Sequence, residues 1–178
     1  GGDAVFVGMR LPYRVQHDEA DAVAAVEFVD ADEAVTVNVA PGVDASMAER
    51  LDYLDAQRRR VEAGGGEARQ AKQHERGKMT ARERIDNFVD EGTFRETGMF
   101  MTHRTTDFGM DTADAPADGV VTGTAAVLGR AVHVASQDFT VMGGSAGETQ
   151  SRKVAATMRA AADNGTPFVF INDSGGAR

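Results

Sequence analysis

The sequence contains no cysteine, and no apolar stretch in it approaches the length of a membrane span. Without cysteine, the chain offers no disulfide framework, no thiolate nucleophile and no zinc ribbon. Its four histidines are scattered and form no metal-binding pattern, so we predict no metal site. Residues 1–16 lack a basic segment followed by a sustained apolar core, which argues against a secretory signal. We therefore expect a cytoplasmic protein without a membrane partner.

Positive charge is also scarce. The net charge at pH 7 is −9, so a phosphate backbone would repel the chain and we expect no nucleic-acid partner. Residues 1–46 carry nine acidic and two basic residues, whereas residues 47–178 carry nineteen and seventeen. The first segment contains no repeat, phosphate-binding loop or aromatic cluster. It has room for a short strand or helix, but we interpret residues 1–46 as an acidic extension that is not part of the core.

From residue 46 onward the sequence carries clear helix signals. Ser46 and Glu49 form a capping box, and we predict a helix from there to Gly64. Its apolar positions recur at helical spacing: Met47, Leu51, Leu54 and Val61. A second capping box, Thr80 with Glu83, predicts another helix that Gly92 ends.

The stretch "EARQAKQHERGKM" between these two helices is rich in Lys and Arg. A solvated helical face accounts for this composition, and a surface for an anionic ligand is the alternative.

After Gly119 the pattern changes to strands. "VVTGTAAV" and "AVHVAS" flank "LGR", which predicts a hairpin closed around Gly129. Ser145 and Glu148 form a third capping box, and Gly165 and Pro167 end the helix that it opens. Its apolar face is predicted at Val154, Met158 and Ala161. The helix leads into an apolar strand at 168–171, so we expect a parallel strand pair buried on both faces, and an α/β fold preceded by helices.

Two glycine pairs are the best candidates for chemistry. In "MGGSAGE", Gly143 and Gly144 precede a helix N-terminus, where backbone amides attract anions, although such a pair taken alone is more often a tight turn than a ligand cradle. In "NDSGGAR", the amides of Gly175 and Gly176 are placed to stabilise a thioester oxyanion without any titratable side chain.

Side-chain chemistry has weaker support. Ser174 lacks the GxSxG elbow, and neither His103 nor His133 has a spacing that identifies it as a base. His133 is most simply a structural histidine in a strand. Asp173 is interpreted as a helix cap, because no second carboxylate is placed near it.

Four segments, taken in order, resemble the carboxyltransferase (β) subunit of biotin-dependent acyl-CoA carboxylases, of the propionyl-CoA type. They are "GGGEARQAKQHERGKMTARERIDNFVDEGTF", "HRTTDFGM", "DGVVTGTAAVLGRAVHVASQDFTVMGGSAGE" and "FVFINDSGGAR". The resemblance implies that residues 47–178 are the N-terminal part of the acyl-CoA carboxyltransferase N-domain. The implied fold is α/β, a partial crotonase-like (ClpP/crotonase) domain with N-terminal helices.

The resemblance also implies an activity. A carboxyl group passes from carboxybiotin, on a partner biotin carboxylase or carrier subunit, to the α-carbon of propionyl-CoA or acetyl-CoA. Gly175, Gly176 and Ala177 match the oxyanion loop, and Arg76, Lys78, Gly143 and Gly144 become substrate-binding candidates. Full-length members form homo-oligomers, and residues 1–178 alone are expected to be inactive.

Two alternatives stay open at the level of the sequence. One is a decarboxylase subunit of a sodium pump from the same superfamily, which runs related chemistry in reverse. The other is a non-catalytic fragment that acts only in assembly.

Overall fold

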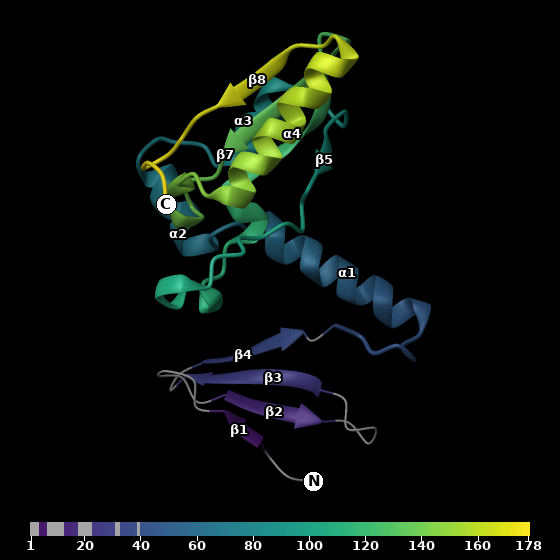
Figure 1. The fold of residues 1–178 in the computed structure, drawn as a ribbon, viewed down its shortest axis with the longest axis vertical. Helices are drawn as coiled ribbons and strands as arrows, with labels where there is room; N and C mark the ends of the chain where they lie inside the picture. Colours follow the sequence, from purple (N-terminus) through teal and green to yellow (C-terminus); the bar gives the residue numbers. More distant parts are fainter. Residues whose placement is uncertain (1–3, 7–12, 18–22, 31–32, 39) are drawn as a thin grey trace. The chain divides into compact units, whose positions relative to one another are not determined.

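The computed structural model describes residues 4–6, 13–17, 23–30, 33–38 and 40–178, and it divides into two units, Gly1–Gln57 and Arg58–Arg178 (Figure 1). The first unit contains a four-stranded antiparallel sheet in the order β1-β2-β3-β4. Its strands are β1 (Ala4–Phe6), β2 (Tyr13–His17), β3 (Val23–Asp30) and β4 (Glu33–Asn38). This is more regular structure than the single strand or helix for which we expected room. That residues 1–46 lie outside the core stays a prediction.

Helix α1 (Met47–Glu62) begins where the sequence predicts. The Ser46 amide donates to Glu49 Oε2 at 2.7 Å, and the Glu49 amide donates to Ser46 Oγ at 3.3 Å, which is a complete capping box. Its predicted apolar face is only partly buried. Val61 is buried, whereas Met47 and Leu51 are 71% and 52% exposed.

Helix α2 (Glu67–Glu75) lies in the basic stretch, and α3 (Ala81–Phe88) follows the predicted capping box of Thr80 and Glu83. The prediction that Gly92 ends α3 is wrong, since Val89 already has extended backbone angles. The chain leaves the helix early because the Asp90 side chain forms hydrogen bonds outside the helix. Its carboxylate accepts the amides of Leu128 and Gly129 at 2.9 and 2.7 Å.

The sheet of the second unit has the order β5-β6-β7-β8. Its strands are β5 (Arg95–Thr97), β6 (Val120–Val127), β7 (Arg130–Gln137) and β8 (Phe168–Ile171). The hairpin of β6 and β7 is confirmed, and its two turn residues have positive φ, 51° at Leu128 and 75° at Gly129. The core joins this sheet to α3 through Ala81, Ile85, Val121 and Val134.

Strands β7 and β8 are parallel and are connected by α4 (Glu148–Asn164), as predicted. The expected burial of β8 on both faces is wrong, because all four of its residues are half-buried. In the described part of the chain β8 is an edge strand that pairs with β7 alone.

Two further expectations for α4 are wrong. Ser145 caps no helix: the N-cap is Gly147 without a side-chain bond, and the Gln150 amide of the first turn instead donates to Asp118 Oδ2 at 2.7 Å. The buried face is also rotated from the predicted one. Of the predicted residues, Ala161 is buried, Val154 is half-buried and Met158 is exposed. The other buried residues of α4 are polar: Thr149, Gln150, Lys153 and Thr157.

Lys153 explains why polar residues occupy this face. Its Nζ donates to the carbonyl oxygens of Ala117 and Val120 at 2.8 and 2.6 Å. Burial lowers the pKa of Lys153 to about 8, against the opposing charges of Glu96 and Asp118. Tertiary partners, which no helical period encodes, therefore decide the orientation of α4.

Candidate active site

The two glycine pairs that the sequence singles out lie against each other. They belong to loops that follow β7 and β8, and the carboxyl ends of parallel strands meet at one edge of a sheet. The Gly175 amide donates to the Gly143 carbonyl oxygen at 2.9 Å, and the Ala146 amide donates to that of Gly176 at 2.8 Å. A Cβ on Gly144 would lie 2.1 Å from the Asp173 carbonyl oxygen, so only glycine fits there.

The three predicted oxyanion donors are not equivalent. The Gly175 amide is bonded to Gly143, and the Gly176 amide donates to Ser174 Oγ at 3.1 Å. Ala177 pairs with Ala146 in a parallel bridge whose hydrogen bonds use the Gly176 carbonyl and the Arg178 amide. That bridge does not use the Ala177 amide, which has no acceptor among the described residues and is therefore the one of the three that is free to donate to a ligand oxygen.

Asp173, at the start of this loop, is an ion-pair partner and caps no helix among the described residues. Its carboxylate accepts Lys78 Nζ at 2.5 Å and a second bond from Arg84, and its amide donates to Gln137 Oε1 at 3.1 Å. Burial acts to raise the pKa of Asp173, but the bonds from Lys78 and Arg84 outweigh it and hold the pKa below its usual value. The predicted ligand residue Lys78 is thus paired within the protein, and it also lies over the Phe139 ring.

A cavity of about 590 Å³ lies between α2 and the first glycine loop. Arg76 and Gly143, both predicted site residues, line it, whereas Lys78 and Gly144 are not among its lining residues. Three residues that were not predicted as site residues line it too: Arg69, Lys72 and Gln73. Their spacing along α2 places them on one helical face with Arg76, and this helical spacing can be read from the sequence.

Gln73 makes this cavity a candidate binding site. The residue is 3% exposed, and its Oε1 has no hydrogen-bond partner in the described part of the chain. A buried acceptor of this kind is costly unless a ligand or water satisfies it.

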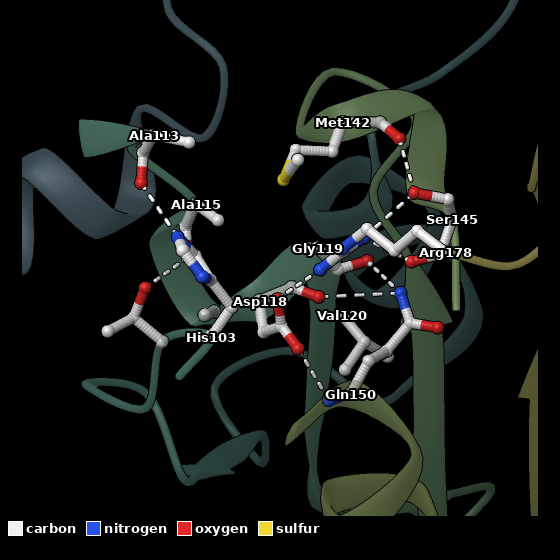
Figure 2. Close-up of polar contacts among 12 residues, drawn as sticks. His103, Ala113, Ala115, Asp118, Gly119, Val120, Met142, Ser145, Gln150 and Arg178 are labelled. Carbon is white, nitrogen blue, oxygen red and sulfur yellow. Dashed lines mark hydrogen bonds and ion pairs between the residues drawn. The ribbon is translucent and has the colours of Figure 1, made fainter. Parts of the chain in front are cut away.

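The histidines are engaged away from Ser174. His133 Nδ1 lies 2.8 Å from Thr166 Oγ1, as expected for a structural histidine, and His103 Nε2 lies 2.8 Å from the Ala113 carbonyl oxygen (Figure 2). Ser174 Oγ donates to the Gly176 carbonyl at 3.0 Å. The geometry supports chemistry by backbone amides and not by a serine–histidine pair.

Two features are absent from the described residues. No group of three or more His, Cys, Asp or Glu side chains there is arranged to hold a metal ion. No helix in that part of the chain combines the length and apolar character needed to span a bilayer.

Comparison with known proteins identifies relatives. The chain is 62% identical over 133 residues to the methylmalonyl-CoA carboxyltransferase 12S subunit of Propionibacterium freudenreichii subsp. shermanii, covering 75% of this chain and 25% of the relative. It is 52% identical over 132 residues to the propionyl-CoA carboxylase beta chain of Roseobacter denitrificans, covering 74% and 26%. It is 49% identical over 131 residues to the methylmalonyl-CoA decarboxylase subunit alpha of Propionigenium modestum, covering 74% and 25%.

A solved structure gives the same result in three dimensions. The transcarboxylase 12S crystal structure, with methylmalonyl-coenzyme A and methylmalonic acid bound, matches with a TM-score of 0.75 and 60% identity over 78% of this chain and 27% of that one. This match confirms the expected α/β, crotonase-like fold with N-terminal helices. The chain spans about a quarter of the length of the curated relatives that it matches. The model of the carboxyl transferase domain matches residues 72–178, and the chain belongs to that family.

Proposed function

We propose that this chain forms the acyl-CoA side of a carboxyltransferase, which moves a carboxyl group from carboxybiotin to the α-carbon of a short acyl-CoA such as propionyl-CoA or acetyl-CoA. One observation carries the proposal. The glycine loop at Gly143 borders both the basic cavity along α2 and the loop of residues 174–177. One ligand can therefore reach cationic side chains with one end and backbone amides with the other.

The basic end of the cavity suits the phosphate groups of coenzyme A. Arg69, Lys72 and Arg76 contribute positive charge, and Asp114 is the acidic residue among the lining side chains. Arginine binds phosphate in a planar, bidentate manner, so Arg69 and Arg76 are the stronger candidates. Lys78 is a weaker one because Asp173 already neutralises it.

At the other end, backbone amides hold the thioester oxygen. Negative charge develops on that oxygen when the α-proton leaves, so a fixed N–H donor stabilises the enolate more than the ground-state thioester. We assign this role to the loop of Gly175, Gly176 and Ala177, with the Ala177 amide as a direct donor. Biotin, when bound, supplies the carboxyl group and the base. The residues described here fit the acyl-CoA side of that reaction.

A decarboxylase is the second candidate function, and its support is the 49% identity to a methylmalonyl-CoA decarboxylase subunit. The same amides stabilise the same enolate in either direction, so the partner proteins distinguish the two. With the carboxyltransferase function we also propose a biotin carboxylase or carrier subunit as partner, a homo-oligomeric assembly and a cytoplasmic location. A role in assembly alone would leave the cavity and the Ala177 amide without a ligand.

A graft tests the proposal. Residues 47–178 replace the matching segment of the 12S subunit from Propionibacterium freudenreichii, and carboxyl transfer from carboxybiotin on a carrier protein to propionyl-CoA is measured. We expect turnover, and we expect R69Q/R76Q to raise KM for propionyl-CoA about tenfold or more, because bonds to charged groups contribute roughly 1.5–3 kcal/mol each.

The control is R159Q, which removes one positive charge from an exposed position on α4, outside the cavity. It should leave KM unchanged. A folded graft without turnover, or equal effects of R69Q/R76Q and R159Q on KM, would contradict the proposal.

A further inference from the structure

Asp118 is a fully buried carboxylate that connects separate parts of the second unit. It lies in a turn before β6, and its side chain has no solvent exposure. Oδ2 accepts the Gln150 amide of α4 at 2.7 Å, and Oδ1 forms an ion pair with Arg178 (Figure 2). Burial of a charge is unfavourable unless it is paired and hydrogen-bonded, and both oxygens of Asp118 are.

Arg178 links Asp118 to the loop of residues 174–177. Its guanidinium also donates to the carbonyl and the hydroxyl of Ser145, the latter at 2.8 Å (Figure 2). Its backbone amide donates to the Ala146 carbonyl at 2.8 Å, directly after Ala177. The position of the Ala177 amide therefore depends on where Arg178 is held.

Gln150 carries a second connection to the other glycine loop. Its backbone amide binds Asp118, and its side-chain Nε2 donates to the Gly144 and Gly119 carbonyl oxygens, both at 3.2 Å. Both loops of the candidate site thus depend on the same carboxylate.

The turn that holds Asp118 is itself strained. Ala117 and Asp118 have φ of 51° and 50°, which is uncommon for residues other than glycine. Lys153 Nζ restrains the turn through its bond to the Ala117 carbonyl at 2.8 Å. Strained backbone of this kind persists where surrounding contacts over-determine it, and it is enriched near functional sites.

We propose that Asp118 is a positioning residue for carboxyl transfer, which acts through Arg178 to fix the Ala177 amide against the thioester oxygen. This inference rests on the proposed function. Asp118 does not transfer protons in this scheme, because it has no exposed surface and both oxygens are bonded within the protein. Its effect is on the rate, since displacing a donor by about 1 Å can slow turnover by a hundredfold.

The test uses D118N, R178Q and the double variant in the 12S graft. We expect D118N and R178Q each to lower kcat at least about tenfold while KM for propionyl-CoA changes less than about threefold. The double variant should lose no more than the worse single variant, because the two side chains act as one unit. The matched control is R82Q, which breaks the ion pair with Glu96 at 2.7 Å and does not contact either loop. It should lower the melting temperature and spare kcat.

A second readout does not require activity. Amide hydrogen exchange across residues 174–178 is compared between the 178-residue chain and its D118N and R178Q variants, with R82Q as control. We expect faster exchange in the loop for D118N and R178Q only. If the graft is inactive but the loop exchange changes as expected, the proposed function fails and the positioning contact stands.

Three results would overturn the inference: unaltered kcat in folded R178Q, additive losses in the double variant, or loop exchange that R82Q accelerates equally. R178Q keeps the test informative if D118N does not fold, since the Arg178 side chain is partly exposed.

Discussion

Gly176 shows how one residue combines backbone geometry with a proposed catalytic role. Its φ is +136°, a region that side chains rarely adopt, yet a Cβ there would meet no atom within 4 Å. A substitution is therefore strained by its backbone and not by crowding. The neighbouring Gly175 is held differently, through its bond to Gly143.

We predict that G176V in the 12S graft lowers kcat about a hundredfold or more, because the β-branched residue displaces the neighbouring amide donors. KM for propionyl-CoA should change less, since the interaction strengthens in the transition state. The measurement is kcat, KM and melting temperature of the purified variant.

Gly92 provides the control for G176V. It has a φ of +70° and open space at its Cβ, but it lies outside the loops. G92V should lower stability and preserve kcat. A folded G176V with normal kcat would remove Gly176 from the site.

At the scale of elements, the three predicted capping boxes show which helix starts depend on neighbouring residues and which depend on tertiary contacts. Those of Ser46 and Thr80 form as predicted, because all their atoms lie within one helical turn. The third predicted box, Ser145 with Glu148, does not form although its sequence matches the capping-box pattern equally well. Ser145 Oγ donates to the Met142 carbonyl at 2.7 Å and accepts from Arg178, while Asp118 serves the α4 N-terminus.

We predict that T80A lowers the free energy of unfolding of the second unit by about 1 kcal/mol, the usual contribution of an N-cap. Helix α3 provides Ala81 and Ile85 to the core, so its fraying is coupled to the whole unit. Urea unfolding measures the change. T105A makes the same chemical change at an exposed threonine and should have little effect; equal losses in both variants would show that the Thr80 cap contributes nothing.

At the scale of the molecule, the chain divides into two compact units, and their boundary falls within α1. The acidic segment forms its own sheet, β1 to β4, whose pairings join neighbouring strands of the same unit. The core around Ile85 and Val134 is built from residues 81–171.

We predict that deleting residues 1–46 shifts the melting temperature of the second unit by less than about 2 °C, which corresponds to well under 1 kcal/mol. Calorimetry measures the shift. Deleting residues 1–62 is the contrasting variant, because it also removes the buried Val61, and it should lower the melting temperature clearly. A large shift after the shorter deletion would place the acidic segment in the core.

The sequence by itself determined what depends on neighbours along the chain. Helix starts at Ser46 and Thr80, the hairpin turn at Leu128 and Gly129, and the parallel β7–α4–β8 unit all follow from local spacing. It also singled out both glycine pairs and Arg76 as candidate site residues, because glycine pairs and clustered basic residues are visible without a fold.

Only the tertiary structure decided how these pieces combine. It brought Gly143 to Gly175, paired Lys78 with Asp173, and turned α4 so that Lys153 and Gln150 are buried. Asp118 and Arg178 had no distinguishing pattern, since they are 60 residues apart and their ion pair exists only once the sheet has formed. Long-range contacts of this kind depend on the three-dimensional path of the chain, and the spacing of residues along the sequence does not specify that path.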